Sequence, residues 1–232
     1  MDVALQRDSS QPEEVSFIHN LMPHPTLLAG DMGGTKTLLA LYDLEGSRLI
    51  KRHQQRFVSA DWTSLEPMLQ TFVEERPKQV HAPTHGCIAV AGPVRNRQAR
   101  ITNLPWQLKE EDLAAAAGMQ QLELVNDFAV LIYGLPHIDA DQQVVLQEGE
   151  QDDGPLAILG AGTGLGMARG VQTAQGLLAL ASEGGHREFA PRNAAEWDLA
   201  CWLKQDLGVS RLSIERIVSG TGLGHVAHWL LQ

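Results

Sequence analysis

Glycine, threonine and carboxylate residues near the start of the chain have the spacing of a phosphate-binding loop. The segment GDMGGTKT, residues 30–37, is within one residue of the pattern G-x-x-x-x-G-K-[ST], because Thr35 stands where the second glycine belongs. That pattern opens a helix, whereas an apolar run of strand length, residues 37–42, follows here. The segment therefore predicts a strand, a glycine loop and a second strand. In such a hairpin the backbone N–H groups around Gly33 and Gly34 can surround a phosphate.

Two side chains extend the phosphate interpretation of this loop. Thr35 would add a hydroxyl donor, and Asp31 would offer a carboxylate to Mg²⁺, either directly or through water. A glycine hairpin without any ligand is the alternative for this stretch taken alone.

A second glycine-rich segment, GAGTGLG at residues 160–166, repeats the arrangement. It misses the dinucleotide fingerprint G-x-G-x-x-G, because Leu165 stands where the third glycine belongs. Residues 155–180 nonetheless follow the same order as residues 25–50, namely apolar run, Gly/Thr loop, second run, turn and third run. The duplication favours two related domains with a polyphosphate held between their loops.

The tripeptide NDF follows a predicted strand, QLELV at residues 121–125. Open α/β sheets bind ligands just past the carboxyl ends of their strands, so Asn126 and Asp127 are candidates for chemistry. Asp127 could instead cap a helix that begins at Phe128.

Two further polar candidates lie in the second half of the chain. Glu183 and His186 flank a glycine pair in SEGGH, so both side chains could converge on one small polar ligand. The alternative is a solvated carboxylate next to a structural imidazole. Glu215 is predicted on a helix that leads into another glycine turn, where by itself it would be helix surface.

The elements around these candidates predict an α/β fold. HGCIAVAGPV at residues 85–94 reads as a buried strand that ends at Gly92 and Pro93, and KEEDLAAAAG at residues 109–118 as a helix that ends at Gly118. The predicted organisation is a flexible tail over residues 1–24, a small α/β domain over 25–136 and a larger, partial α/β domain over 137–232.

Composition excludes several classes of protein. The 232 residues carry a net charge of −10 without a basic cluster, which argues against nucleic-acid binding. Cys87 and Cys201 are far apart and are expected to be reduced and buried. There is neither an apolar leader segment nor an apolar run approaching the length of a membrane span, so the expected location is cytoplasmic, without a membrane partner.

Taken together and in order, six motifs resemble the bacterial-type glucokinases of the hexokinase, Hsp70 and actin superfamily: AGDMGGTKT, TNLPWQL, LVNDFAV, GAGTGLG, SEGGHREFAPR and ERIVSGTGL. The resemblance implies a ribonuclease-H-like (actin-like ATPase) fold of two domains around a cleft. It also implies transfer of the γ-phosphoryl group of ATP, with Mg²⁺, to the 6-hydroxyl of D-glucose. The cysteine-rich zinc motif of the related ROK kinases does not follow His186.

The resemblance assigns a role to each candidate residue. Asp127 is the expected catalytic base, and Asp31 the expected contact to Mg²⁺. The expected sugar contacts are Asn126, Asp127, Glu183, His186 and Glu215. The expected contacts to ATP are Gly30, Asp31, Met32, Gly33, Gly34 and Thr35 in the first loop, and Gly162, Thr163 and Gly164 in the second.

The end of the sequence departs from this family. Glucokinases continue into a further glycine-rich motif for adenosine, whereas this chain stops at HVAHWLLQ. The resemblance therefore predicts an incomplete second domain, exposed apolar surface and a poor kinase. A non-catalytic sugar-binding remnant or regulator, and a kinase for another hexose, remain as alternatives, and a homodimer is left open. SEGGH together with NDF argues against a sugar-independent ATPase.

Overall fold

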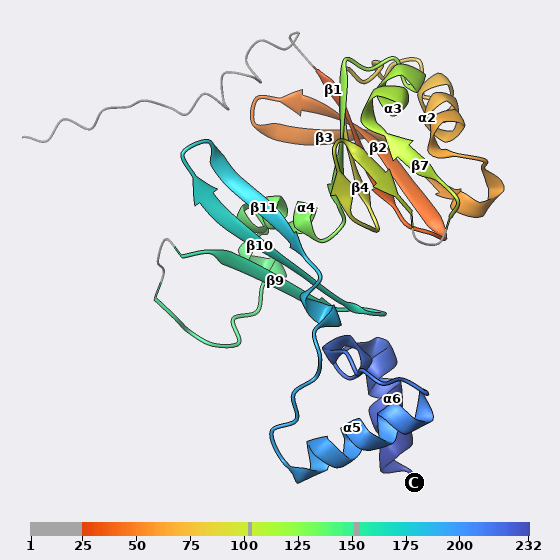
Figure 1. Cartoon of the computed structure of the whole chain (residues 1–232). Coiled ribbons are helices and arrows are strands. Elements are labelled where there is room, and N and C mark those ends of the chain that lie inside the picture. Colours follow the sequence, from red (N-terminus) through yellow and green to blue (C-terminus); the bar gives the residue numbers. More distant parts are fainter. Residues whose placement is uncertain (1–24, 102–103, 151–153) are drawn as a thin grey trace, which may run out of the picture. The chain divides into compact units, whose positions relative to one another are not determined.

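The computed structural model describes residues 25–101, 104–150 and 154–232 (Figure 1). The predicted tail, residues 1–24, lies outside these ranges. The chain forms two compact units, Met1–Asp127 with Gln172–Leu177, and Phe128–Val171 with Leu178–Gln232. The boundary between the two units lies after Asp127, whereas the sequence predicts the end of the first domain at residue 136. Each unit is described by itself below.

A five-stranded sheet in the order β3-β2-β1-β4-β8 organises the first unit. β1 (Thr26–Met32) pairs antiparallel with β2 (Lys36–Glu45), which pairs antiparallel with β3 (Arg48–Val58). β4 (His85–Val90) lies parallel to both β1 and β8 (Gln121–Asn126). The predicted strand, glycine loop and strand are therefore confirmed. The turn into β3 contains Gly46 at φ 62°, a left-handed conformation that favours glycine.

Two helices cover one face of this sheet (Figure 1). α2 (Leu65–Glu74) buries an apolar stripe at helical spacing, namely Leu65, Met68, Leu69, Phe72 and Val73. α3 (Glu110–Ala116) has three acidic residues in its first turn and is followed by Gly118 at φ 65°, as the sequence predicts. A short η1 turn (Ser59–Asp61) and a small sheet of β5 (Val94–Arg95), β6 (Gln98–Arg100) and β7 (Gln107–Lys109) complete the unit.

The second unit begins with α4 (Ala129–Gly134), followed by two short turns, η2 (Leu135–His137) and η3 (Ala140–Gln142). Its sheet contains β9 (Leu156–Ala161), β10 (Leu165–Thr173) and β11 (Gly176–Ser182) in the order β11-β10-β9. This order repeats β3-β2-β1, and the glycine-rich loop again connects the first two strands. The predicted duplication is thus present in the topology.

The remainder of the second unit is helical. After η4 (Gly184–His186), α5 (Ala194–Asp206), η5 (Ile214–Arg216) and α6 (Gly220–Leu230) pack around a small core of Leu199, Ala200, Leu203 and Leu212. The prediction of a helix at Glu215 followed by a glycine turn is wrong. Glu215 lies in the short η5 turn, and the glycines after it form the first turn of α6, because Ser219 caps that helix by accepting a hydrogen bond from the Gly222 N–H.

Apolar side chains are unevenly covered in the two units. The first unit buries a large cluster that includes Leu28, Leu39, Phe72 and Ile88. On the sheet of the second unit, by contrast, Leu156, Leu159, Leu178 and Leu180 are exposed. The predicted apolar exposure is therefore seen on the second sheet. No helix within the described ranges is long and apolar enough to cross a bilayer.

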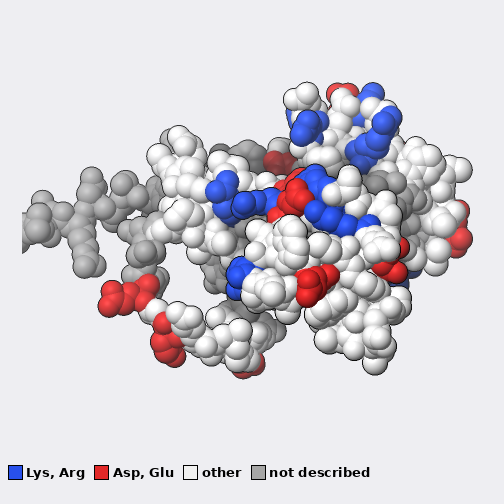
Figure 2. Space-filling view, turned by 60° about the horizontal axis from the view of Figure 1, so that its bottom comes forward, with Lys and Arg blue, Asp and Glu red and all other residues white. Residues whose placement is uncertain are grey.

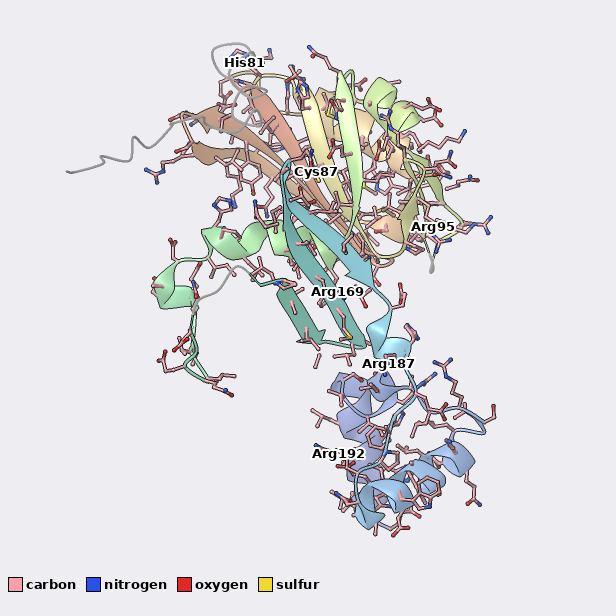
Figure 3. All side chains as sticks on the ribbon, turned by 60° about the vertical axis from the view of Figure 1, so that its left-hand side comes forward. His81, Cys87, Arg95, Arg169, Arg187 and Arg192 are labelled. Atoms are coloured by element: carbon pink, nitrogen blue, oxygen red, sulfur yellow. The ribbon has the colours of Figure 1, made fainter. Side chains whose placement is uncertain are left out.

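The two cysteines differ in environment. Cys87 is half-buried on β4 (Figure 3), whereas Cys201 on α5 is exposed, so the prediction of two buried thiols is wrong for Cys201. Burial raises the pKa of the Cys87 thiol to about 11, and the nearby carboxylates of Glu123 and Glu110 add to the shift. Exposure at Cys201 follows from its place on the face of α5 opposite Leu199 and Leu203, which are buried.

We expect iodoacetamide at pH 8 to alkylate Cys201 well before Cys87. Thiolate is the reactive form, and a thiol with a pKa of about 11 is only about one part in 10³ thiolate at this pH. Mass spectrometry of peptides from timed samples measures the alkylated fraction at each position. Equal rates for the two cysteines in the folded protein would contradict this expectation, and denatured protein provides the control in which the difference disappears.

Candidate active site

The first glycine loop leaves the carboxyl end of β1 and is anchored by a buried serine. The Gly33 N–H donates to the Lys36 carbonyl oxygen at 2.9 Å, which closes the hairpin. Ser59 is fully buried, and its hydroxyl donates to the Gly33 carbonyl at 3.0 Å while its N–H donates to the Thr35 carbonyl at 3.0 Å. One residue, Ser59, thus donates hydrogen bonds to two carbonyl groups of the loop. Ser59 is not among the candidates from the sequence. It belongs to none of the motifs, and its only distinguishing feature in the sequence is that it directly follows a strand.

Two of the six predicted positions in this loop are determined by the core. A Cβ atom at Gly30 would lie 2.9 Å from Ile88 Cγ1, so close packing between strands accounts for glycine there. The Met32 side chain is buried in the core, which leaves only its backbone for a ligand. The part of the loop that can meet a phosphate is therefore residues 33–35 together with Asp31.

Asp31 fits a magnesium ion that is brought in by a nucleotide. Its side chain is exposed near the end of β1. Mg²⁺ commonly takes one or two carboxylates and obtains its other ligands from phosphates and water. No group of three or more His, Cys, Asp or Glu side chains that could hold a metal occurs among the described residues.

Asn126 and Asp127 lie at the same edge of the sheet as the first loop. Asn126 ends β8 opposite Val90 of β4, and Met32 of β1 is the partner of Val90 on the other side. The Asp127 N–H donates to the Val90 carbonyl at 3.0 Å. The Asn126 amide Nδ2 donates to the Gly92 carbonyl at 3.1 Å and to Asp127 Oδ1 at 3.0 Å. Parallel strands thus bring the first loop and the carboxylate to one edge, with β4 between them.

The side chain of Phe128, the residue after Asp127, packs against a pair of glycines. Phe128 is the N-cap residue of α4, and its ring lies over Gly160 and Gly166, which are partners across β9 and β10. A Cβ atom would lie 2.5 Å from the ring at Gly160 and 2.0 Å at Gly166. The outer glycines of GAGTGLG are therefore required by an aromatic ring. Sequence reasoning missed this role of Phe128, because nothing local links it to glycines more than 30 residues away.

The second glycine loop is also anchored through its carbonyl groups. The Gly220 N–H donates to the Gly162 carbonyl at 2.7 Å, and the Thr221 hydroxyl donates to the Thr163 carbonyl at 3.0 Å. Both donors belong to the first turn of α6. The first turn of α6 thus supports the second loop in the way that Ser59 supports the first.

The SEGGH segment forms a tight turn that brings its two polar side chains together. His186 Nε2 and Glu183 Oε2 are 3.5 Å apart, and both side chains are more than half exposed. Arg187 follows the turn (Figure 3). A Cβ atom at Gly185 would lie 2.2 Å from the Leu165 carbonyl oxygen, so only glycine lets the turn pack against the start of β10.

The Glu215 side chain, which extends from η5, also contacts Leu165. Its carboxylate oxygen Oε2 accepts a hydrogen bond from the Leu165 N–H at 2.9 Å. A Cβ atom at Gly164 would lie 2.3 Å from this oxygen, so the carboxylate accounts for glycine at that position. The second glycine loop, the SEGGH turn and Glu215 therefore meet around Leu165 within the second unit.

A cavity of about 560 Å³ lies elsewhere, at the amino-terminal ends of the parallel strands in the first unit. Leu27 of β1, His85 of β4 and Gln121 of β8 are among its lining residues. Because ligands of open α/β sheets bind at the opposite, carboxyl ends, this cavity does not coincide with the candidate site.

On one face of the molecule (Figure 2), the described residues form no concentrated basic area. On the face shown in Figure 2, most of the surface is uncharged, and Lys and Arg side chains lie in small groups beside Asp and Glu. The described part of this face has no continuous basic surface of the kind that neutralises many nucleic-acid phosphates.

Comparison with known proteins identifies relatives that cover most of the chain. The profile of the family described as Glucokinase matches residues 28–232. A glucokinase of Nostoc sp. is 40% identical over 206 residues, which cover 88% of this chain and 60% of that protein. A glucokinase of Synechocystis sp. is 40% identical over 213 residues with the same coverage. The chain therefore spans about 60% of the length of these relatives.

Solved structures confirm the α/β fold. The crystal structure of a glucokinase from an Antarctic psychrotroph has a TM-score of 0.73 and 33% identity, covering 87% of this chain and 62% of that one. The glucokinase of Balamuthia mandrillaris in complex with glucose has a TM-score of 0.67 at 22% identity and covers 90% of this chain and 63% of that one. The second match supports the fold alone. With the profile match over residues 28–232, these findings show that the chain belongs to the glucokinase family.

Proposed function

We propose that this chain carries the sugar-binding and phosphate-binding parts of an ATP-dependent glucokinase, which transfers the γ-phosphoryl group of ATP to the 6-hydroxyl of D-glucose. The observation that carries the proposal is the meeting of the second glycine loop with Glu215 and the SEGGH turn around Leu165. Groups suited to a sugar and a loop suited to a phosphate are thereby adjacent, as phosphoryl transfer to a sugar requires.

Four side chains are proposed to read the stereochemistry of the sugar. Each sugar hydroxyl can both donate and accept a hydrogen bond. The carboxylates of Glu183 and Glu215 would accept from hydroxyls, the Asn126 amide can do either, and His186 can do either according to its tautomer. Polar groups that pair with particular hydroxyls discriminate against sugars that lack the matching hydroxyl.

Asp127 is the proposed catalytic base. Its carboxylate accepts a hydrogen bond from the Asn126 amide and its backbone is fixed to β4 through Val90, so the group is held in place before a substrate arrives. It would accept the proton of the 6-hydroxyl late in the transfer, because the transition state is loose and the oxygen gains acidity only as the new bond forms.

The two glycine loops are the proposed phosphate contacts. Residues 33–35 and 162–164 have carbonyl groups tied back to Ser59 and to α6, respectively. The Gly33 N–H closes the hairpin by donating to Lys36, so the N–H groups of Gly34 and Thr35, with those of residues 162–164, are the ones proposed to face the anion. Mg²⁺, when bound with ATP near Asp31, would neutralise charge on the phosphate oxygens. The proposed location is the cytoplasm, because ATP is the proposed phosphoryl donor.

The sequence leaves open whether the protein forms a homodimer. Light scattering of the purified protein measures its oligomeric state.

A coupled assay for glucose 6-phosphate tests the function. We expect product with glucose and MgATP, and less with mannose or fructose at equal concentration. Sugar binding by calorimetry without any turnover would indicate the non-catalytic alternative, and higher turnover with another hexose would change the substrate. The absence of both sugar binding and turnover would contradict the proposal.

Substitution of Gly34 by valine is expected to weaken ATP binding by at least about tenfold and to leave glucose affinity nearly unchanged. A β-branched side chain would fill the space beside the loop N–H groups that a phosphate needs. Calorimetric titration with each ligand measures both affinities. Gly224→Val on α6, where a Cβ atom meets nothing within 4 Å, is the matched control. Equal losses for ATP and glucose would instead indicate a folding defect.

A further inference from the structure

The N–H group of Leu165 is occupied by a carboxylate in the described structure. Leu165 is the first residue of β10 and follows the second glycine loop directly. Glu215 Oε2 accepts its hydrogen bond at 2.9 Å, across 50 residues of sequence. The same oxygen fills the space in which a side chain at position 164 would lie. An anionic side chain thus lies against a loop whose proposed ligand is also an anion.

The carbonyl groups of this loop do not offset the negative charge of the carboxylate, because their oxygens also carry partial negative charge. Those of Gly162 and Thr163 already accept hydrogen bonds from Gly220 and Thr221. Two anions that share one small loop repel each other, and at a partly buried position this repulsion is stronger than in water. A phosphate that approaches the loop therefore meets the Glu215 carboxylate as a competitor for the Leu165 N–H.

The backbone around Glu215 is fixed, so any change must occur in its side chain. The Ser219 hydroxyl donates to the Glu215 carbonyl at 2.7 Å. The Ile214 N–H donates to the Arg187 carbonyl at 2.8 Å, which ties η5 to the residue after the SEGGH turn. A sugar held by that turn therefore lies within the part of the second unit that also holds Glu215.

We propose that Glu215 couples the sugar to the second phosphate loop. Without sugar, its carboxylate occupies the Leu165 N–H. Sugar hydroxyls that donate to the carboxylate draw it away, and the Leu165 N–H becomes available to a phosphate. The proposal rests on the proposed function for the sugar contacts and the loop. Its consequence is that sugar tightens phosphate binding and, by linkage, phosphate tightens sugar binding by the same factor.

Calorimetric titration of the full chain with magnesium tripolyphosphate, with and without saturating glucose, tests this coupling. Tripolyphosphate is the probe because it has no adenosine. In the unaltered chain we expect glucose to tighten tripolyphosphate binding by about tenfold, or about 1.4 kcal/mol. In Glu215→Gln, tripolyphosphate without glucose is expected to bind about tenfold more tightly than in the unaltered chain, because the competing charge is gone. Glucose should then change the affinity by less than about twofold.

An exposed carboxylate outside the proposed site provides the matched control. Asp198→Asn removes one negative charge from α5. It is expected to leave unchanged both the tripolyphosphate affinity without glucose and the effect of glucose on that affinity. The same response in Asp198→Asn and Glu215→Gln would mean a general charge effect and would overturn the coupling proposed for Glu215.

The outcomes separate this inference from the proposed function. If the unaltered chain binds both ligands independently, or if Glu215→Gln weakens tripolyphosphate, the coupling is overturned and the proposed function stands. If the unaltered chain binds neither ligand, the proposed function fails as well. Should Glu215→Gln not fold by circular dichroism, Glu215→Asp gives a second route. Its carboxylate is one methylene shorter and is expected to release the Leu165 N–H. Tripolyphosphate without glucose should then bind more tightly than in the unaltered chain, but by less than in Glu215→Gln, because the negative charge remains.

Discussion

Replacement of Asp127 by alanine is expected to lower the turnover of glucose phosphorylation by about 10²- to 10⁴-fold, the usual contribution of a general base. Glucose should still bind measurably, because the carboxylate acts mainly on the reacting hydroxyl while the other proposed sugar contacts remain. Loss of turnover without a matching loss of affinity is the signature of an interaction made in the transition state. The coupled assay gives turnover, and calorimetry gives the glucose dissociation constant.

Asp198 on α5 provides the control for this experiment. Its side chain is exposed and lies outside the proposed site, so Asp198→Ala removes the same group without touching the proposed chemistry. Near-normal turnover in Asp127→Ala would remove Asp127 from its proposed role. Equal losses of turnover in both variants would point to net charge or stability instead.

Substitution of Gly185 by alanine is expected to weaken glucose binding on the order of 10²-fold, which corresponds to about 2.7 kcal/mol. The added Cβ atom would lie 2.2 Å from the Leu165 carbonyl oxygen, which is backbone and cannot rotate away. The SEGGH turn must therefore move off β10, and Glu183 and His186 move with it. Overpacking of this kind typically costs about 1–3 kcal/mol of stability, so thermal melting should fall as well.

The adjacent glycine is a close control. A Cβ atom at Gly184 would lie 2.6 Å from Met167 Sδ, which belongs to a flexible side chain. Gly184→Ala should therefore cost less glucose affinity than Gly185→Ala, although both change the same turn by one methyl group. Equal glucose affinities in the two variants would show that the contact with Leu165 does not position the turn.

The two glycine loops show how a duplicated element is supported by unrelated means. In the first unit, Ser59 holds two carbonyl groups of residues 33–35. In the second, the first turn of α6 holds those of Gly162 and Thr163. Both arrangements fix the carbonyl side of the loop, which is the side that would repel a phosphate.

The sequence by itself determined the strands, the glycine loops and the helix at α3. Each depends on local chemistry: apolar runs of strand length predict β1 and β8, and glycine at position 118 ends α3 because it adopts φ 65° without strain. The duplicated order of elements was also readable, and the sheet order β11-β10-β9 repeats β3-β2-β1.

Only the tertiary structure decided which side chains support the site. Ser59 meets Gly33 across 26 residues, and Glu215 meets Leu165 across 50. The glycines at positions 160 and 166 are explained by Phe128, and those at 164 and 185 by Glu215 and by the Leu165 carbonyl. A local pattern records that a glycine is present but not which distant atom requires it. The physical reason is that periodicity and turn chemistry act over a few residues, whereas steric exclusion and hydrogen bonding between segments arise only once the chain has folded.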